Sequence, residues 1–502
     1  MIRRSEAILS LPGERRDVVD IPAAASRGRG QHRWLVIAGL SACATFATID
    51  AYAGDTPEGN LLPPPPPALP PPALPALAPT PAVPPPDAPK PLDLREPPFA
   101  NKDFSWLNGS NRQPDSLLHI GPTILSLYVD VFYAFQFNRP VDHTIFPTTV
   151  APRHNEIGLN LASIGIELPP NAIDTARGGP VGQFSLQYGD FVQAVSGQDT
   201  TVKRGFFLAN DALQAVRTAS AGWHFHVLHG VNLEFGVFPS YMGMESYLPQ
   251  ENWNYTHPFV SDFTPYYFYG GRAQMYLTSN VKLELWVVNG WQTYGQWQEA
   301  KSGGYLLNWR PSERFIAANV IYVGQTEPGD SGSIRYYTDN YAQVQYFKSA
   351  TGFVTSSALC IVGDLGYQSR SSPAPSGPMA GASLTHRTEF GDGFALTFRG
   401  DIYYDETRAV TNTLPIGSPY VLPDATQPFL GGGFTTTLDY LPSPWVLTRI
   451  EYSHRAANVP FFSGPGGITG NGPDGQVGTI SPFVPDLVKS DDRIIANVTL
   501  RL

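Results

Sequence analysis

Charged side chains recur at alternate positions along many segments of this chain. In 267–277 the odd positions hold tyrosine, glycine, alanine, methionine and leucine, and the even positions include Arg272 and Gln274. After a short polar turn the alternation resumes, with Lys282 and Glu284 opposite a face of valine and leucine. A period of two predicts β-strands with one apolar and one polar face. The chemistry available to such a polar face is electrostatic, because fixed charges attract, orient or exclude charged and dipolar solutes.

Sequence patterns of catalysis or metal binding are weak. There is no Gly-x-Ser-x-Gly elbow, no His-Glu-x-x-His pair and no phosphate loop ending in Gly-Lys-Ser/Thr. Ser383 and His386 fall in one predicted strand but on opposite faces, which is unsuitable for a hydrolase. His224 and His226 share a face about 7 Å apart along a strand, and His229 follows in a turn. Because no carboxylate or cysteine pattern lies nearby, we interpret these histidines as polar wall residues. The sequence implies no cofactor.

The elements that must position the charges are sixteen alternating segments from about residue 117 onward. Their predicted spans are 124–137, 155–168, 181–190, 212–228, 231–240, 265–277, 281–291, 303–310, 314–324, 334–347, 357–367, 378–388, 393–404, 431–440, 445–454 and 492–502. The second and tenth segments shift phase or lack a clean apolar face, so the strand number could also be 14 or 18. The last segment alternates up to Leu502, as expected for a strand that closes a barrel.

The lengths of the connections follow a rule. Connections after even-numbered segments are often tight, whereas several after odd-numbered segments are long, at about 138–154, 191–211, 241–264, 405–430 and 455–491. Short turns at one end and long loops at the other are typical of an outer-membrane barrel, with the long loops extracellular and the short turns periplasmic. We therefore predict an all-β transmembrane antiparallel barrel of about sixteen strands. Closure gives every backbone group a partner in lipid.

The predicted barrel assigns a lumen face to one set of charges, if the apolar face of each strand is outward. The predicted pore-lining residues are Asp130, Glu234, Arg272, Lys282, Glu284, Arg310, Arg387, Arg399, Asp401, Arg449, Glu451 and Arg493, with Asp339, Asp364 and Arg501 in the same register. The last five segments contribute a continuous basic arc, made of Arg387, Arg399, Arg449, Arg493 and Arg501. The arc could give a transverse field across a pore, or its members could be ordinary salt-bridged wall residues.

Composition and charge agree with this fold class. Of the 502 residues only 15% are charged and 12% are aromatic, and the mean hydropathy is −0.15. Barrels have such a profile, because only alternate residues meet lipid. The formal net charge of −10 argues against a nucleic-acid partner.

The first 94 residues indicate export. Residues 1–53 resemble a signal peptide, with basic residues before an apolar core and the small-x-small pattern Ala51–Ala53. A competing lipoprotein site would leave Cys43 as a lipidated first residue. Residues 54–94 are a proline-rich segment, expected to be an extended periplasmic linker. We expect 95–116 to be a periplasmic lead-in and 117–502 to be the barrel.

Several short stretches, taken in order, resemble a known family. They are Phe104–Gln113 (FSWLNGSNRQ), Pro140–Ile145 (PVDHTI), Arg153–Glu156 (RHNE), Gln250–Tyr255 (QENWNY) and Val288–Trp291 (VNGW). Together they are similar to the outer-membrane β-barrel porins of proteobacteria in which a WLNG segment precedes the first strand. The resemblance covers about 95–502 and implies a porin-type barrel, but it carries no substrate.

The connection at about 242–265 is the third outer loop by this count. In general porins that loop folds inward and narrows the channel, and position by analogy suggests the same here; a surface-exposed cap is the other reading. The residues of this predicted constriction loop are Glu245, Glu251, Trp253, Tyr255 and Asp262.

Passive diffusion of small hydrophilic solutes or ions through a bacterial outer-membrane barrel is the function that these features favour. The partners expected are outer-membrane lipid and lipopolysaccharide, the barrel-assembly machinery, the solutes themselves and, as for many porins of this strand number, a homotrimer. Three alternatives stay open: a loop-plugged barrel with a structural or adhesion role, an outer-membrane lipid hydrolase, and a soluble secreted β-protein.

Overall fold

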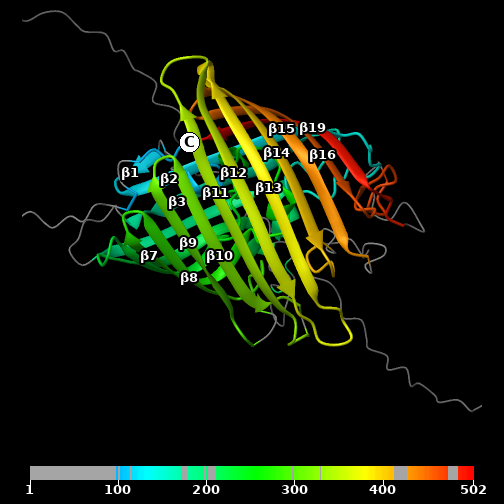
Figure 1. The fold of residues 1–502 in the computed structure, drawn as a ribbon, viewed down its shortest axis with the longest axis horizontal. Coiled ribbons are helices and arrows are strands. Elements are labelled where there is room, and N and C mark those ends of the chain that lie inside the picture. The colour runs from blue at the N-terminus through cyan, green and yellow to red at the C-terminus, as the bar shows by residue number, and fades with distance from the viewer. Residues whose placement is uncertain are drawn as a thin grey trace, which may run out of the picture. The chain divides into compact units, whose positions relative to one another are not determined.

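Sixteen antiparallel strands form one closed sheet in the computed structural model of this chain (Figure 1). The structure describes residues 98–99, 102–112, 116, 118–170, 178–196, 199, 201, 211–296, 299–327, 329–411, 427–472 and 484–502, all within the compact unit Asp87–Leu502. The predicted signal peptide at 1–53 and the proline-rich segment at 54–94 lie outside the described residues.

The strands of the ring pair in sequence order. They are β2 (Thr123–Gln136), β3 (Glu156–Leu168), β4 (Gly179–Tyr188), β5 (Val216–Phe225), β6 (Val231–Pro239), β7 (Tyr267–Thr278), β8 (Val281–Val288), β9 (Ser302–Ser312), β10 (Phe315–Gln325), β11 (Ile334–Lys348), β12 (Val354–Gln368), β13 (Gly377–Phe390), β14 (Phe394–Asp405), β15 (Phe429–Ser443), β16 (Val446–Ala457) and β19 (Ser490–Arg501). β19 closes the ring by pairing with both β16 and β2. Each predicted segment corresponds to one of these strands, so the prediction of sixteen is confirmed.

A short extra strand, β1 (Leu118–Ile120), lies at the seam. It pairs with the beginning of β2, with Leu118 opposite Leu125, on the edge of β2 that β19 occupies further along, where Arg501 is opposite Tyr128. β1 therefore continues the line of β19 toward the end of the barrel where β2 begins.

The connections confirm the parity rule. Two-residue turns follow β7 at 279–280, β9 at 313–314 and β15 at 444–445, and the long connections lie at the opposite end. We call the first three long connections L1 (137–155), L2 (189–215) and L3 (240–266). L2 contains α1 (Asp190–Ser196) and η3 (Asp211–Ala215), and L3 contains η4 (Pro249–Glu251) and α2 (Phe259–Asp262). None of the described helices is long and apolar enough to cross a membrane.

The remaining elements are small. η1 (Gly109–Asn111) precedes the barrel, and η5 (Gly391–Gly393) forms the turn between β13 and β14. β17 (Phe462–Ser463) pairs with β18 (Leu487–Val488) in the last long connection.

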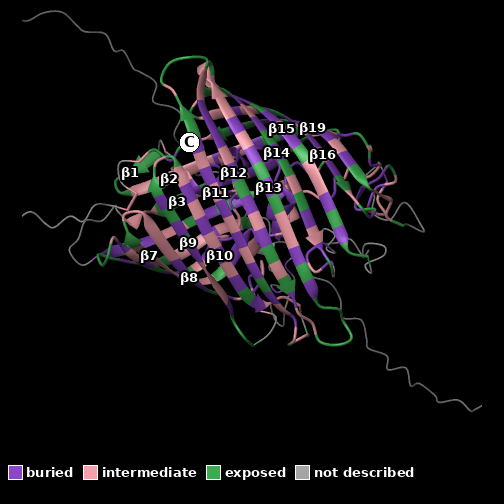
Figure 2. Ribbon diagram, viewed as in Figure 1, coloured by how far each residue is buried: buried purple, intermediate pink, exposed green. Residues whose placement is uncertain are grey.

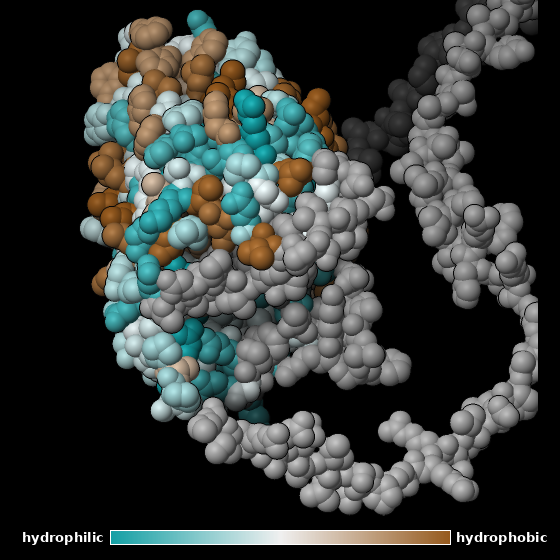
Figure 3. Space-filling model, turned by 90° about the vertical axis from the view of Figure 1, so that its right-hand side faces the viewer, coloured by the Kyte–Doolittle hydropathy of each residue, from teal (hydrophilic) through white to brown (hydrophobic). Residues whose placement is uncertain are grey.

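Burial alternates along the strands of the ring (Figure 2). The exposed residues on the outside are largely apolar, and many of the buried residues on the inside are polar or charged. In β19, Ile494 and Val498 are exposed, whereas Arg493 and Asn497 are buried. The outward side chains include Ile157, 81% exposed, and Phe235, 73% exposed. In Figure 3 brown apolar side chains gather over the upper and left parts of the face in view, and the lower end is mostly teal. Water-exposed apolar surface on this scale would be an aggregation hazard, whereas lipid accepts it.

Inside the ring, the core consists of inserted segments packed against the wall. One apolar cluster joins Phe104, Trp106 and Leu107, which precede β1, to Met244 and Trp253 of L3, and its other members include residues of β9 to β12. The lumen is therefore partly filled from both ends of the barrel.

Two β-bulges interrupt the alternation, one in the second predicted segment, where the alternation shifts phase, and one in the fourth. Between β2 and β3 the register skips Asn160, and between β4 and β5 it skips Arg217. A bulge inserts one unpaired residue and re-aims side chains locally. The fourth predicted segment, 212–228, also begins too early, since 212–215 is part of η3. Tyr267, on the odd-numbered face, is only 2% exposed and stacks on Tyr294 at 4.6 Å, so it does not share the exposure of Tyr269.

Candidate functional site

L3 lies inside the barrel and is held against strands β14 to β16. Arg449 donates from Nη1 to the Pro249 carbonyl at 2.8 Å and from Nη2 to the Asn252 carbonyl at 2.5 Å. Glu451 accepts from the backbone N–H groups of Tyr255 at 2.6 Å and Thr256 at 3.0 Å. These wall residues bind the loop backbone, so the path of L3 depends on the wall charges.

Three further contacts extend this attachment. Arg399 donates to the carbonyl and, at 3.3 Å, to the hydroxyl of Thr256. The Tyr255 hydroxyl donates to Asp130 at 2.9 Å. Arg455 contacts Asp262 at 3.0 Å and lies over the ring of Phe259 at 4.6 Å. Hydrogen bonds between charged groups and backbone are among the strong ones in proteins, so L3 is fixed along its central part.

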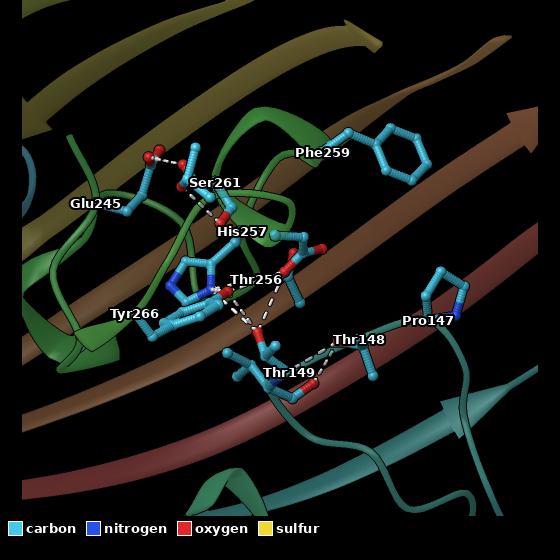
Figure 4. Close-up of polar contacts among 12 residues, drawn as sticks. Pro147, Thr148, Thr149, Glu245, Thr256, His257, Phe259, Ser261 and Tyr266 are labelled. Atoms are coloured by element: carbon cyan, nitrogen blue, oxygen red, sulfur yellow. Dashed lines mark hydrogen bonds and ion pairs between the residues drawn. The ribbon is translucent and has the colours of Figure 1, made fainter. Parts of the chain in front are cut away.

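His257 ties L3 to L1 through a buried network (Figure 4). Its Nδ1 lies 2.9 Å from the Tyr266 hydroxyl and 3.2 Å from Thr149 Oγ1, and Asn252 Nδ2 donates to Nε2 at 3.2 Å. An amide nitrogen only donates, so Nε2 accepts and Nδ1 carries the ring proton. Burial, followed by the charges of Arg399 and Arg455, lowers the pKa of His257 from 6.5 to about 4, against an opposing effect of Asp262. The imidazole is therefore neutral at pH 7.

The predicted basic arc is a set of paired arginines. Arg387 and Arg449 share Asp439, at 2.7 and 2.9 Å. Arg399 lies 3.8 Å from Asp401, Arg493 lies 3.5 Å from Asp491, and Arg501 lies 3.4 Å from Glu251. The geometry thus favours the salt-bridged wall over an uncompensated basic field, because each of these guanidinium groups has a carboxylate within 4 Å.

The other predicted pore-lining charges also lie at inward positions and pair locally. Arg272 contacts Glu234 at 2.7 Å, and Lys282 contacts Glu284 at 2.7 Å. Arg310 lies over Phe104 at 4.9 Å. Nine of the twelve residues are buried, and Arg272, Lys282 and Asp401 are intermediate, with the Asp401 side chain only 1% exposed, so none of the twelve faces the lipid side.

Two cavities remain beside L3. The outer cavity has a volume of about 440 Å³ and is lined by residues of several long connections, among them Thr149, Asp199, Asp262, Thr264, Tyr266, Glu327, Arg370 and Arg408. The inner cavity, of about 150 Å³, is lined by Ser110, Arg217, Pro239, Ser240, Met242, Gly243, Glu245, Ser246, Tyr247, Leu248, Glu251, His257, Ser261, Thr264, Pro265 and Tyr266. Thr264 and Tyr266 border both, so the two cavities are adjacent at the end of L3.

The inner cavity brings together opposite charges that the sequence did not pair. Glu245 accepts a hydrogen bond from Ser261, and Glu251 accepts one from Ser246; both carboxylates belong to the predicted constriction loop. Arg217 of β5 lines the same cavity. In the described part of the chain its only hydrogen bond runs from Nε to Ser163 Oγ, at 3.2 Å. Burial raises the pKa of Glu245.

Arg217 was missed because strict alternation places it on the outward face with Ala219 and Ala221. The bulge between β4 and β5 skips this residue in the ladder, and its side chain lines the inner cavity beside the inward residue Thr218, which is 3% exposed. Arg455 was missed because the predicted strand stopped at residue 454. A charged residue next to a break in alternation is the only sequence signal that could have found Arg217.

The catalytic and metal candidates are placed apart from these cavities. Ser383 is buried, whereas His386 pairs with the outward Tyr346 hydroxyl at 2.6 Å. His224 bonds Asn232 at 2.6 Å, and its ring lies 4.9 Å from that of His226. Within the described ranges no three His, Cys, Asp or Glu residues are grouped so as to hold a metal ion.

Residues 122–482 match the model of the family described as "Putative beta-barrel porin-2, OmpL-like". The chain belongs to this family. The match covers nearly the whole ring from β2 onward, and it makes the protein a porin of the bacterial outer membrane, with L1, L2 and L3 at the extracellular end and the two-residue turns in the periplasm.

Solved structures of outer-membrane proteins are among the matches to this chain, at TM-scores below 0.5. The anion-selective porin from Comamonas acidovorans has a TM-score of 0.43 at 8% identity, over 76% of this chain and 99% of that one. OprB of Pseudomonas putida has a TM-score of 0.45 at 8% identity, over 76% and 94%. OmpT of Vibrio cholerae, in a trimer form, has a TM-score of 0.44 at 9% identity, over 76% and 99%. No curated protein matches the sequence significantly.

Proposed function

We propose that small hydrophilic solutes and ions cross this porin by passive diffusion through the outer cavity and then the inner cavity. The observation that carries the proposal is that both cavities border Thr264 and Tyr266. The inner cavity lies between L3 and β5, whereas the other side of L3 is attached to β14 to β16. A solute therefore passes on the side of L3 that the wall arginines leave open.

The narrowest part of this route is the inner cavity, and its charges give the route its selectivity. Arg217 is on the wall side and Glu245 and Glu251 are on the loop side. Opposite charges across a narrow, poorly screened space orient dipolar solutes and oppose the entry of apolar ones. The proposed pore-lining residues that act on the solute in the inner cavity are thus Arg217, Glu245 and Glu251. Of the arc, Arg399, Arg449 and Arg501 act on L3.

Transport by diffusion involves no catalytic step, and the proposal is that the protein is not an enzyme. Ser383 and His386 on opposite faces of β13 support this, since a nucleophile and its base must be within hydrogen-bond reach. Turnover of a lipid or ester that is lost on Ser383→Ala would contradict it.

The proposed partners follow from the surface. The outward apolar belt fits lipid and lipopolysaccharide, and insertion of such a barrel would use the barrel-assembly machinery. A homotrimer is proposed as the assembly, and light scattering of the protein in a mild detergent tests it by mass.

A second candidate function is a plugged barrel with a structural or adhesion role. It is favoured by one observation, the apolar cluster that joins L3 to the segment preceding β1 in the interior. The two candidates differ in conductance. Purified, refolded protein in planar bilayers should show steady channels with a defined reversal potential in a salt gradient if solutes diffuse through it. Negligible conductance at all voltages would favour the plugged barrel.

A further inference from the structure

We infer that the segment preceding β1 forms the periplasmic half of the constriction and limits the size of the solutes that pass. We call residues 98–99 and 102–112 the lead-in segment. The inference rests on the proposed route, because it assigns the inner end of that route to a second inserted segment besides L3.

The lead-in segment enters the barrel at the periplasmic turns. The Phe99 N–H donates to the Ser279 carbonyl at 2.9 Å, in the turn between β7 and β8. The Trp106 indole donates to the Glu313 carbonyl at 2.7 Å, in the turn between β9 and β10. Phe104 and Leu107 are fully buried. The segment is therefore attached to the rim of the barrel and turned into its interior.

Inside, Asn108 lies between the wall and L3. Its backbone N–H donates to Gln343 Oε1 of β11 at 2.7 Å, and its Oδ1 accepts from the Trp253 N–H of L3 at 2.6 Å. Trp253 Nε1 in turn donates to the Trp106 carbonyl at 3.1 Å. L3 and the lead-in segment are thus joined by direct hydrogen bonds, so they are in contact at this point.

The segment also crosses the mouth of the barrel. Asn111 contacts Arg310 of β9 and Tyr341 of β11, both at 3.2 Å. A few residues later β1 pairs with β2, and β10 lies eight positions from β2 in the ring of sixteen strands. Asn111 and β1 therefore lie at opposite sides of the ring.

The end of the lead-in segment borders the proposed route. Ser110 lines the inner cavity together with Arg217 and Glu245. Arg112 donates from Nη1 to the Glu251 carbonyl at 3.2 Å, next to the carboxylate that faces the cavity. Ser110 and Tyr266 line the same cavity, so displacement of the segment should widen the route.

Gly109 offers a way to displace it. Its φ is +72°, and a Cβ at this position would lie 1.7 Å from the Met244 carbonyl oxygen of L3, so Gly109→Ala forces the segment and L3 apart. Gly121, in the turn between β1 and β2, has φ +59° and nothing within 4 Å of a Cβ. Gly121→Ala is the matched control, with the same backbone strain and no steric conflict.

The experiment compares full-length wild type, Gly109→Ala, Trp106→Ala and Gly121→Ala in planar bilayers and in liposome swelling with neutral sugars of increasing size. We expect a several-fold rise in single-channel conductance and a larger size limit for Gly109→Ala and Trp106→Ala, and wild-type values for Gly121→Ala. A merely structural role would lower the temperature of unfolding without changing the size limit.

The outcomes separate the inference from the proposed function. If wild type conducts and both lead-in variants, folded, keep its conductance and size limit, the inference is wrong and the proposed route stands. If wild type is silent and the variants conduct, the segment closes the barrel completely, which supports the inference and overturns free diffusion through the resting protein. If neither the wild type nor any of the variants conducts, the inference and the proposed function are both wrong.

Discussion

Arginines lie on both sides of L3, but they are paired with carboxylates on one side and border a cavity on the other. Toward β14 to β16, Arg399 and Arg449 have carboxylates within 4 Å and donate to the loop backbone. Toward β5, Arg217 contacts Ser163 and lines an open cavity. A guanidinium that is already neutralised and hydrogen-bonded has little field left for a solute, whereas one that faces a cavity retains it. The arginines beside L3 thus divide into those that position the loop and Arg217, which lines the inner cavity of the proposed route.

The difference between the two sides of L3 is tested most directly by Arg449→Ala, on the side where L3 is attached to β14 to β16. Removal of the guanidinium takes an arginine from the buried Asp439 and donors from two L3 carbonyls. A buried charge left without any partner costs about 3–5 kcal/mol; Asp439 keeps Arg387 at 2.7 Å, so the loss of stability should be smaller than that. We expect a lower temperature of unfolding and a larger, noisier conductance as L3 detaches. Heat-dependent gel mobility and single-channel recording measure the two effects.

Its control is Arg153→Ala, which removes the exposed pair with Glu156 in L1. An exposed pair contributes at most about 1 kcal/mol, so both readouts should stay near wild type. Equal behaviour of Arg449→Ala and Arg153→Ala would show that the wall arginines do not hold L3.

The pH dependence of stability tests a second contact of L3, the buried His257 network that joins it to L1. The pKa of His257 is about 4 in the folded protein against 6.5 for an ordinary histidine, so the unfolded chain binds a proton at pH values where the folded one does not. The free energy of unfolding is therefore lowered as the pH falls from 6.5 toward 4, by at most about 3 kcal/mol, and this contribution is constant above 6.5. Unfolding temperatures at pH 7 and pH 4.5 measure it.

His257→Gln keeps a hydrogen-bonding side chain without a titrating ring, and it should flatten the stability profile between pH 6.5 and 4. If the variant and wild type lose the same stability over this range, the titration of other groups accounts for the loss, and the His257 network between L1 and L3 is not pH-sensitive.

Ion selectivity distinguishes the two sides of L3. Arg217→Ala should shift the reversal potential toward cation preference, because it removes the one cation from a cavity that keeps Glu245 and Glu251. Arg217→Lys should retain most of the wild-type selectivity. Stability should change little, since a single hydrogen bond to Ser163 is lost, worth about 1 kcal/mol. A larger shift for Arg399→Ala than for Arg217→Ala would assign selectivity to the basic arc instead.

The smallest effect is expected for Glu245→Gln. It should shift the reversal potential toward anions, in the opposite direction to Arg217→Ala, but by less, because Glu251 remains in the same cavity. Burial raises the pKa of Glu245, so its effect should fade as the pH is lowered, before that of an ordinary glutamate. A shift toward cations would place Glu245 outside the route.

Much of the fold could be predicted from the residues, because a period of two is a local pattern. The sixteen segments, the sorting of short and long connections and the inward position of charges such as Arg272 and Glu284 depend on neighbours two residues apart, and lipid outside the barrel makes that pattern strict. The pattern became unreliable at Asn160 and Arg217, where a bulge depends on the partner strand and so cannot be read from one strand alone.

The sequence by itself therefore determined the barrel and its inward charges, and the tertiary structure decided what those charges do. Whether Arg449 meets a solute or the Pro249 carbonyl depends on a contact between residues 200 positions apart. The same is true of Asn108 and Gln343, 235 positions apart, which place the WLNG segment inside the barrel. Pairing over such distances follows from the closed ring and the path of L3 across it, and alternation within a strand carries no information about either.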